Sequence, residues 1–263
     1  MPRLSQSEQS ARLPPKICKL IAMNDLAVTP EQLLSDFHQH SPTGICISAA
    51  QGSRFAKTIA GDHNPIHDVD APRFCVPGDL LFALIAGRYG LAGTMHIGFN
   101  GMLRADTPLC FPDDPNGAFD ITDERGKAYV SVERSQPLAV AEPVISAFIQ
   151  AYVACSGESF PGLLQPLLKA HDVMFNPERP LVVYDSMRIE LARAPESAVE
   201  LTLEDSALSV DGKRGDVRFD FAVSDNGRAI GRCAKKMVVS GLRPYDDTTM
   251  QALIDDYEAR RRG

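Results

Sequence analysis

Residues 80–91 restrict the fold of this chain more than any other segment, because their sequence, LLFALIAGRYGL, is apolar almost all the way round a helix. A helix on a protein surface carries a polar face, whereas one that is hydrophobic all round is buried. We therefore predict a central helix here, preceded by Val76-Pro77-Gly78-Asp79 and surrounded by other elements.

Beyond Gly93 the hydrophobic pattern changes to a period of two, which is typical of strands with one buried face. Residues 128–132 follow this pattern behind a turn at residues 123–126. Residues 144–155 alternate in the same way, and their shared face consists of Ile145, Ala147, Ile149, Ala151, Val153 and Cys155. We predict that both segments are antiparallel strands.

The plan is then repeated. A short helix is predicted at residues 160–170, followed by strands at residues 181–191, 199–210, 217–223 and 230–239. Asp211-Gly212 and Asn226-Gly227 are predicted hairpin turns. Residues 246–262 are predicted to form an amphipathic helix, whose apolar side carries Met250, Leu253, Ile254 and Tyr257.

Residues 60–67, with the sequence AGDHNPIH, are the most chemically distinctive stretch of the chain, because an acid, an amide and an imidazole surround a proline. A helical run over residues 54–60 ends at Gly61, which suits the left-handed position after a helix. Pro65 prevents the helix from restarting at once. The stretch is thus predicted to be a short structured overhang.

The proline also restricts the residue before it, so Asn64 should be extended. An extended Asn64 allows Asp62 and His67 to converge on one point. This is the geometry of a paired acid and base.

A buried helix wrapped by an antiparallel sheet, occurring twice, predicts an α+β protein with a double hot-dog fold. The second half is expected to be degenerate, since its helix is shorter and it has no acid–histidine motif. We predict an N-terminal extension that is partly disordered (residues 1–40), a first half with the motif (41–158), a second half without it (159–243) and a C-terminal helix (244–263). Within the extension, Thr29, Pro30 and Gln32 signal the start of a short helix.

The overhang carries a family resemblance. Phe55-Ala56 and then residues 60–67 resemble the G-D-x-N-P-[LIV]-H signature of the MaoC-like, (R)-specific enoyl-CoA hydratases. Pro77-Gly78-Asp79-Leu80-Leu81 stands where that family has its H-G-M-L-L helix start. The longer string over residues 73–84 is similar to an uncharacterised bacterial branch of the same superfamily. The resemblance extends from Phe55 to about residue 91, and further only in plan.

The resemblance implies addition of water to a trans-2-enoyl thioester, giving an (R)-3-hydroxyacyl thioester, or the reverse dehydration, in fatty-acid metabolism. Asp62 and His67 would hold the water, one taking its proton while the other supplies a proton to C2. Asn64 would orient the water or the loop. The implied partner is a CoA or acyl-carrier thioester, and no cofactor and no metal is implied.

Negative charge on the thioester oxygen needs donors that are fixed in advance. The backbone N–H groups of Gly78 and Asp79 are candidates, because the first amides of a helix are unpaired and the helix dipole favours an anion there. The carboxylate of Asp79 has another interpretation, in which it caps the same helix by accepting those N–H bonds.

Other functions stay open at this point. A hot-dog thioesterase would use Asp62 or Asp79 to activate water toward the carbonyl. A non-catalytic acyl-thioester-binding protein would keep the loop without turnover, and Asp62 and His67 would then belong to a structural network. Lys235-Lys236 are interpreted as charges on a solvated face rather than as a phosphate site.

The charge, hydropathy and cysteine pattern argue against several classes of protein function. The formal charge of -7 argues against a nucleic-acid binder, and no apolar run approaches the roughly 20 residues of a membrane span. Six scattered cysteines without a C-x-x-C pair suggest reduced thiols and no zinc site, and His63 is expected to line a pocket or to be exposed rather than to bind metal. A cytoplasmic location is the default prediction, and a homodimer is left open.

Overall fold

Eight strands form one antiparallel sheet in the computed structural model, which describes residues 17–18 and 28–262. The strand order is β1-β9-β10-β11-β8-β4-β6-β5. Their bounds are β1 (Ile17–Cys18), β4 (Thr94–Phe99), β5 (Ala118–Thr122), β6 (Ala128–Arg134), β8 (Leu181–Leu191), β9 (Val199–Asp211), β10 (Arg214–Asp225) and β11 (Arg228–Ser240). Two short ladders pair β2 (Gln39–Ser41) with β3 (Gly44–Cys46) and β7 (Val173–Met174) with β12 (Arg243–Pro244).

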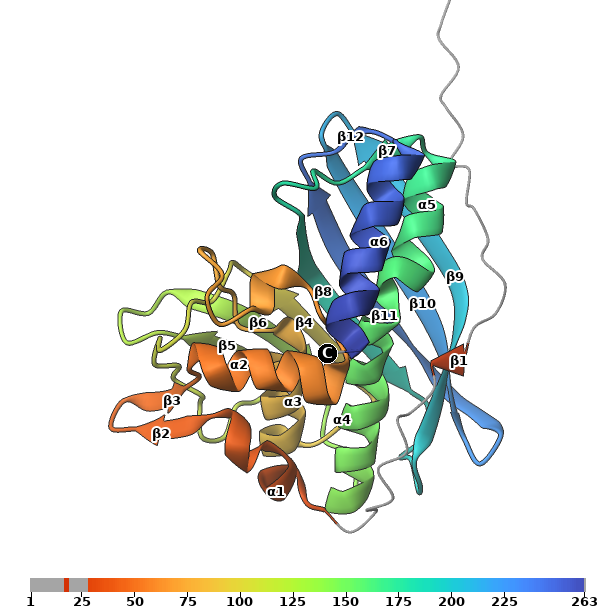
Figure 1. The fold of residues 1–263 in the computed structure, drawn as a ribbon. Coiled ribbons are helices and arrows are strands. Elements are labelled where there is room, and N and C mark those ends of the chain that lie inside the picture. The colour runs from red at the N-terminus through yellow and green to blue at the C-terminus, as the bar shows by residue number, and fades with distance from the viewer. Residues whose placement is uncertain (1–16, 19–27, 263) are drawn as a thin grey trace, which may run out of the picture.

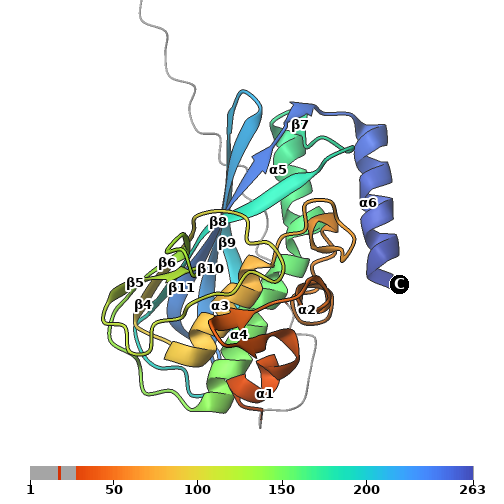
Figure 2. The same cartoon turned by 90° about the vertical axis from the view of Figure 1, so that its left-hand side faces the viewer.

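The helices gather on one side of this sheet, as Figures 1 and 2 show. They are α1 (Pro30–Leu34), α2 (Ala49–Phe55), α3 (Gly78–Tyr89), α4 (Glu142–Gly157), α5 (Leu164–Ala170) and α6 (Asp247–Arg262). Short 3-10 turns η1 (Ser35–Phe37) and η3 (Pro65–His67) and the π-helical segments η2 (Ala56–Ala60) and η4 (Ser159–Leu163) lie between them. Among the helices of the described residues, none combines the length and the apolar character that crossing a bilayer requires.

Helix α3 is the central helix that its sequence predicts. Every residue from Asp79 to Ala86 is buried, so the helix has no solvent-facing stripe. It lies beside α4, and both pack against the sheet (Figure 2). The first turn of α1 also agrees with the sequence, since Thr29 and Gln32 form the predicted reciprocal capping pair. The predicted disorder of residues 1–16 lies outside the described residues.

The predicted strand at residues 144–155 is wrong, because this segment forms most of helix α4. The alternating apolar positions are real, but Phe148 and Tyr152, which lie between them, are also fully buried. A helix enclosed by α3 on one side and the sheet on another buries more than one face, so an alternating pattern does not identify a strand here. The predicted helix at residues 160–170 is observed as η4 followed by α5.

The two halves can now be assigned. Helix α3 goes with β4, β5 and β6, and helix α4 with β8 to β11, and the two sets of strands join where β4 pairs with β8. This arrangement is the predicted double hot-dog. The strands of the second half are the longer ones, its helix is α4 rather than a shorter segment, and what this half lacks is the acid–histidine motif. We propose that the boundary between the halves lies between β6 and α4, instead of at residue 158.

The strands of the second half follow their predicted limits closely. The turn between β10 and β11 has positive φ at both Asn226 (51°) and Gly227 (72°), as a two-residue hairpin of this type requires. Register shifts at Asp220/Phe221 and at Lys236/Met237 interrupt the ladders. Irregularities of this kind bend a sheet, which allows it to curl around α3 and α4. The C-terminal helix α6 is also present and buries Met250 and Tyr257.

Candidate active site

The overhang at residues 61–67 forms as predicted. Segment η2 ends at Gly61, whose φ of 66° is left-handed, and the Asp62 amide donates to the Ala56 carbonyl oxygen at 2.8 Å. Asn64 is extended, with φ of -59° and ψ of 124°. Residues 65–67 then make a single 3-10 turn that brings the chain back toward Asp62.

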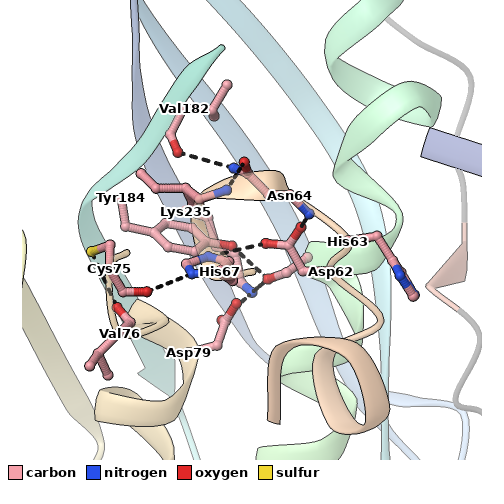
Figure 3. Close-up of polar contacts among 12 residues, drawn as sticks. Asp62, His63, Asn64, His67, Cys75, Val76, Asp79, Val182, Tyr184 and Lys235 are labelled. Atoms are coloured by element: carbon pink, nitrogen blue, oxygen red, sulfur yellow. Dashed lines mark hydrogen bonds and ion pairs between the residues drawn. The ribbon is translucent and has the colours of Figure 1, made fainter. Parts of the chain in front are cut away.

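This turn brings the Asp62 and His67 side chains together (Figure 3). Nε2 of His67 lies 3.7 Å from Oδ2 of Asp62. Nδ1 of His67 lies 2.8 Å from the Cys75 carbonyl oxygen, which can only accept, so Nδ1 carries the proton and donates. In the neutral ring Nε2 therefore presents its lone pair toward Asp62.

Asn64 fixes the overhang in place. Its Oδ1 accepts the Ile66 N–H at 3.2 Å, and its Nδ2 donates to the Val182 carbonyl oxygen of β8 at 3.4 Å. The Asn64 N–H in turn donates to Oδ1 of Asp62 at 2.9 Å. Of the two roles predicted for this residue, orientation of the loop is the one these contacts support.

Electrostatics favour a proton on the acid. Burial is the largest influence on Asp62 and raises its pKa, while the His67 charge and the Asn64 N–H act in the opposite direction. The Asp79 carboxylate adds a smaller upward effect on the same pKa. A raised pKa makes a carboxyl group easier to protonate, which suits it to give a proton to a substrate.

Helix α3 begins at Gly78, as the site prediction requires, but Asp79 does not cap it. The residue before the helix is Pro77, and no side chain caps this end. Oδ1 of Asp79 instead accepts from Nζ of Lys235 at 3.1 Å, and both side chains are almost completely buried. The capping interpretation of Asp79 is therefore wrong.

The exposed position predicted for Lys235 is also wrong. Alternation along β11 places Lys235 on the inward face with Cys233 and Met237, while Lys236 points to solvent. Nζ of Lys235 also donates to Oγ of Ser156 at 2.8 Å, and Oγ of Ser156 lies 2.6 Å from the Tyr184 hydroxyl oxygen. Burial is the largest single influence and would lower the pKa of Lys235, but the Asp79 carboxylate, Tyr184 and Cys155 together outweigh it, and the pKa is raised. Lys235 is thus a buried cation.

A cavity of about 340 Å³ connects these groups to the surface. Asp62, His67 and Gly78 line it together with Ser156 and Tyr184, whereas Asp79 does not. Most of the remaining lining is apolar, and the exposed side chains of Asp185, Arg214 and Asp256 stand at the rim.

Helix α6 supplies one wall of this cavity. Leu253, Asp256, Tyr257 and Arg260 line it, and the Tyr257 hydroxyl accepts the His63 N–H at 3.2 Å. The His63 side chain itself points away from the Asp62 and His67 pair (Figure 3) and packs edge to face on Tyr257. Within residues 17–18 and 28–262, no group of three or more His, Cys, Asp or Glu side chains is placed to hold a metal ion.

Sequence reasoning missed Lys235, Ser156 and Tyr184. Ser156 and Tyr184 carry no motif, and each belongs to the second half of the molecule. For Lys235 a signal did exist, because a lysine in register with Cys233, Met237 and Val239 on one strand is expected to face the core.

The chain is similar to one sequence family and to several solved structures of low identity. A family model described as "Protein of unknown function (DUF3581)" matches residues 32–248. No curated protein matches the chain in sequence. Solved structures similar to it include a conserved protein of unknown function with a hot-dog fold from Alicyclobacillus acidocaldarius, which is 7% identical over 81% of this chain and 99% of its own, with a TM-score of 0.41.

Two further solved structures have named activities. A MaoC-like dehydratase from Phytophthora capsici is 12% identical over 79% of this chain and 98% of its own, with a TM-score of 0.36. An acyl-CoA thioesterase II from Mycobacterium marinum is 11% identical over 65% of this chain and 90% of its own, with a TM-score of 0.37. Similarities this low carry no argument about function, which has to come from the site itself.

Proposed function

Because the chain belongs to a family of proteins of unknown function, DUF3581, we propose its activity from the site alone: it is a hydratase or dehydratase acting on trans-2-enoyl and (R)-3-hydroxyacyl thioesters. The observation that carries this proposal is that the Asp62 and His67 side chains lie 3.7 Å apart and both line a largely apolar cavity. Such a cavity suits an acyl chain, and the pair suits the addition or removal of water.

The 3.7 Å separation of the pair supports a division of roles. Water bound between the two side chains gives one proton to Nε2 of His67, while its oxygen bonds to C3 of the enoyl group. The π electrons of the C2–C3 double bond take the proton of Asp62 at C2. His67 is then protonated and Asp62 ionised, and transfer of that proton from His67 back to Asp62 restores the starting pair.

Charge that develops on the thioester oxygen also needs a donor. The Gly78 amide is the first of α3 and has no partner within the helix, and Gly78 lines the cavity next to the pair. We assign the oxyanion contact to this amide rather than to Asp79, which lies outside the cavity lining.

The assay for this function uses the purified full-length protein with crotonyl-CoA and trans-2-hexenoyl-CoA. Loss of the enoyl absorbance and formation of the (R)-3-hydroxyacyl product are expected. Asp62→Asn and His67→Gln should each lower kcat by about 10²- to 10⁴-fold, because each removes one partner of the proton exchange. Full activity in either variant would refute the assignment.

The same assay separates the other interpretations. Release of free thiol from a saturated acyl-CoA, which has no double bond to hydrate, would identify a thioesterase. Binding of the thioester without any turnover would identify a non-catalytic binding protein. Activity with an acyl-carrier thioester but not with the CoA thioester would identify the carrier. The homodimer and the cytoplasmic location stay predictions, for sedimentation and cell fractionation to test.

A further inference from the structure

A second polar cluster lies on the cavity wall beside the acid–histidine pair, and the proposed chemistry does not use it. It consists of Lys235, Asp79, Ser156 and Tyr184 (Figure 3 labels all but Ser156). Lys235 is 0% exposed and Asp79 2% exposed. Two of the members, Ser156 and Tyr184, line the cavity. The cluster therefore connects a fully buried ion pair to the place where a substrate would lie.

The hydrogen bonds of this cluster run in one direction. An ammonium group has only donors, so Oγ of Ser156 must accept from Lys235. The proton of the Ser156 hydroxyl then needs an acceptor, and among the described residues the Tyr184 oxygen, at 2.6 Å, is the one within reach. Buried hydroxyl groups are nearly always satisfied, which favours this direction over the reverse. The proton of the Tyr184 hydroxyl is consequently left for a partner in the cavity.

Tyr184 also lies close to the start of α3, where a hydrogen-bond acceptor on a substrate would lie. Its ring packs directly against the start of α3, since a Cβ atom at Gly78 would lie 3.1 Å from its Cδ2. The Asp79 and Asp62 carboxylates both lie close enough to act on the electrostatics of Tyr184. Tyr184 thus shares a wall with the Gly78 amide and stands near the acid–histidine pair.

We propose that Tyr184 is a catalytic residue that donates a hydrogen bond to the thioester oxygen beside the Gly78 amide, with Ser156 and Lys235 as positioning residues. The assignment rests on the proposed action on enoyl thioesters. No proton is transferred in this step, because the hydroxyl only stabilises the charge that the oxygen gains. Burial raises the pKa of Tyr184 most, and the Asp79 carboxylate raises it further. The raised pKa keeps the hydroxyl protonated and able to donate.

The first test is Tyr184→Phe in the full-length protein, assayed with crotonyl-CoA. This change removes one oxygen and keeps the ring that packs on Gly78 and Phe99. Loss of one oxyanion donor should lower kcat by about 10²-fold, with a smaller change in KM. Tyr89→Phe is the matched control, because the Tyr89 hydroxyl donates to the Pro112 carbonyl oxygen at the opposite end of α3 and its loss should leave kcat unchanged.

A second readout reports on the carbonyl directly. The absorbance band of trans-2,4-hexadienoyl-CoA moves to longer wavelength when its carbonyl is polarised by a donor. The wild-type protein should shift this band, Tyr184→Phe should shift it less, and Ser156→Ala should fall between the two. A purely structural role for Tyr184 would not change the band of the bound thioester.

The outcomes separate this assignment from the proposed function. If Tyr184→Phe turns over crotonyl-CoA and shifts the band as the wild type does, the role of Tyr184 is overturned. If the wild type shows no turnover but a band shift that depends on Tyr184, the hydratase is overturned and the donor role stands. If the wild type gives neither turnover nor a band shift, both are overturned.

Discussion

Two acid–base pairs lie on either side of the start of α3, and they differ in almost every physical respect. Asp79 and Lys235 are in direct contact at 3.1 Å and sealed in the core, and the lysine is also bonded to Ser156. Asp62 and His67 are 3.7 Å apart and line a cavity that reaches solvent. We call Asp79 and Lys235 the closed pair, because its members contact each other directly and cannot reach a substrate. We call Asp62 and His67 the open pair, because its members leave room for a water molecule between them. The comparison teaches that contact distance and access to solvent distinguish the buried pair from the pair that we propose to be catalytic.

The largest effect is expected from breaking the closed pair. Lys235→Met leaves the Asp79 carboxylate buried without its cation, which should lower the free energy of unfolding by about 3–5 kcal/mol. Urea unfolding followed by circular dichroism measures this change. Lys236→Met is the matched control, because the neighbouring Lys236 is exposed and its replacement should change stability by less than about 0.5 kcal/mol. Equal effects of the two variants would contradict the structural role of the closed pair.

A smaller effect is expected from displacing the open pair without touching the closed one. A Cβ atom at Gly157 would lie 2.6 Å from the Gly61 carbonyl oxygen, so Gly157→Ala should push the overhang away from α4. Alanine has a higher helix propensity than glycine, yet this overpacking should lower the free energy of unfolding by about 1–3 kcal/mol and reduce turnover.

Gly98→Ala is the control for that change, since its nearest neighbour would be 4.0 Å away. It should leave both the urea midpoint and turnover close to wild type. If Gly157→Ala behaved like Gly98→Ala in both measurements, the close packing of α4 on the overhang would not be what positions Asp62.

Replacing both members of the closed pair should have less effect than replacing one. Asp79→Leu combined with Lys235→Met removes the acid together with the cation, so no uncompensated charge is left in the core. The double variant should unfold within about 1–2 kcal/mol of wild type, because an apolar pair of similar volume often replaces a buried ion pair without loss. A double variant as unstable as Lys235→Met would mean that the loss comes from packing rather than charge.

The smallest effect is expected in how the free energy of unfolding depends on pH through Asp62 of the open pair. Burial raises the pKa of Asp62 above its ordinary value of 3.8, so the folded state holds this proton more tightly than the unfolded chain. Its stabilising contribution is complete below 3.8 and is lost as pH rises through the folded-state pKa. Asp62→Asn has no such dependence, so its stability relative to wild type should improve as pH rises above about 4. An opposite trend in urea unfolding would mean that Asp62 is stabilised as an anion by His67.

The sequence predicts the open pair well because its geometry is local. Gly61 and Pro65 set the backbone over a few residues, and Asp62 and His67 meet within that turn. The closed pair joins residues 156 positions apart, and only the pairing of β11 in the assembled sheet brings them together. No local pattern announces that contact, although the inward register of Lys235 could have indicated that it needs a buried partner.

The fold was predictable in strands with one solvent-facing side and in α3, whose residues are apolar all the way round, and less so in α4. Strands β8 to β11 alternate between buried and exposed residues, and their predicted limits are close to the observed ones. Helix α4 is enclosed on several sides, and its alternating apolar residues resemble a strand. Its length of 16 residues and Pro143 in its first turn were the better indicators, because strands are shorter and proline suits the start of a helix.

Helix α6 adds to the cavity a wall that lies far along the chain from the acid–histidine pair. The family model ends at residue 248, so nearly all of α6 lies beyond the region that it matches, whereas Asp62, His67 and Gly78 lie inside it. Leu253 lines the cavity without a polar contact to the acid–histidine pair, whereas Tyr257 both lines the cavity and holds the overhang by accepting the His63 N–H. If the proposed function holds, a substitution at Leu253 changes which molecules fit the cavity while the Asp62 and His67 side chains keep their positions.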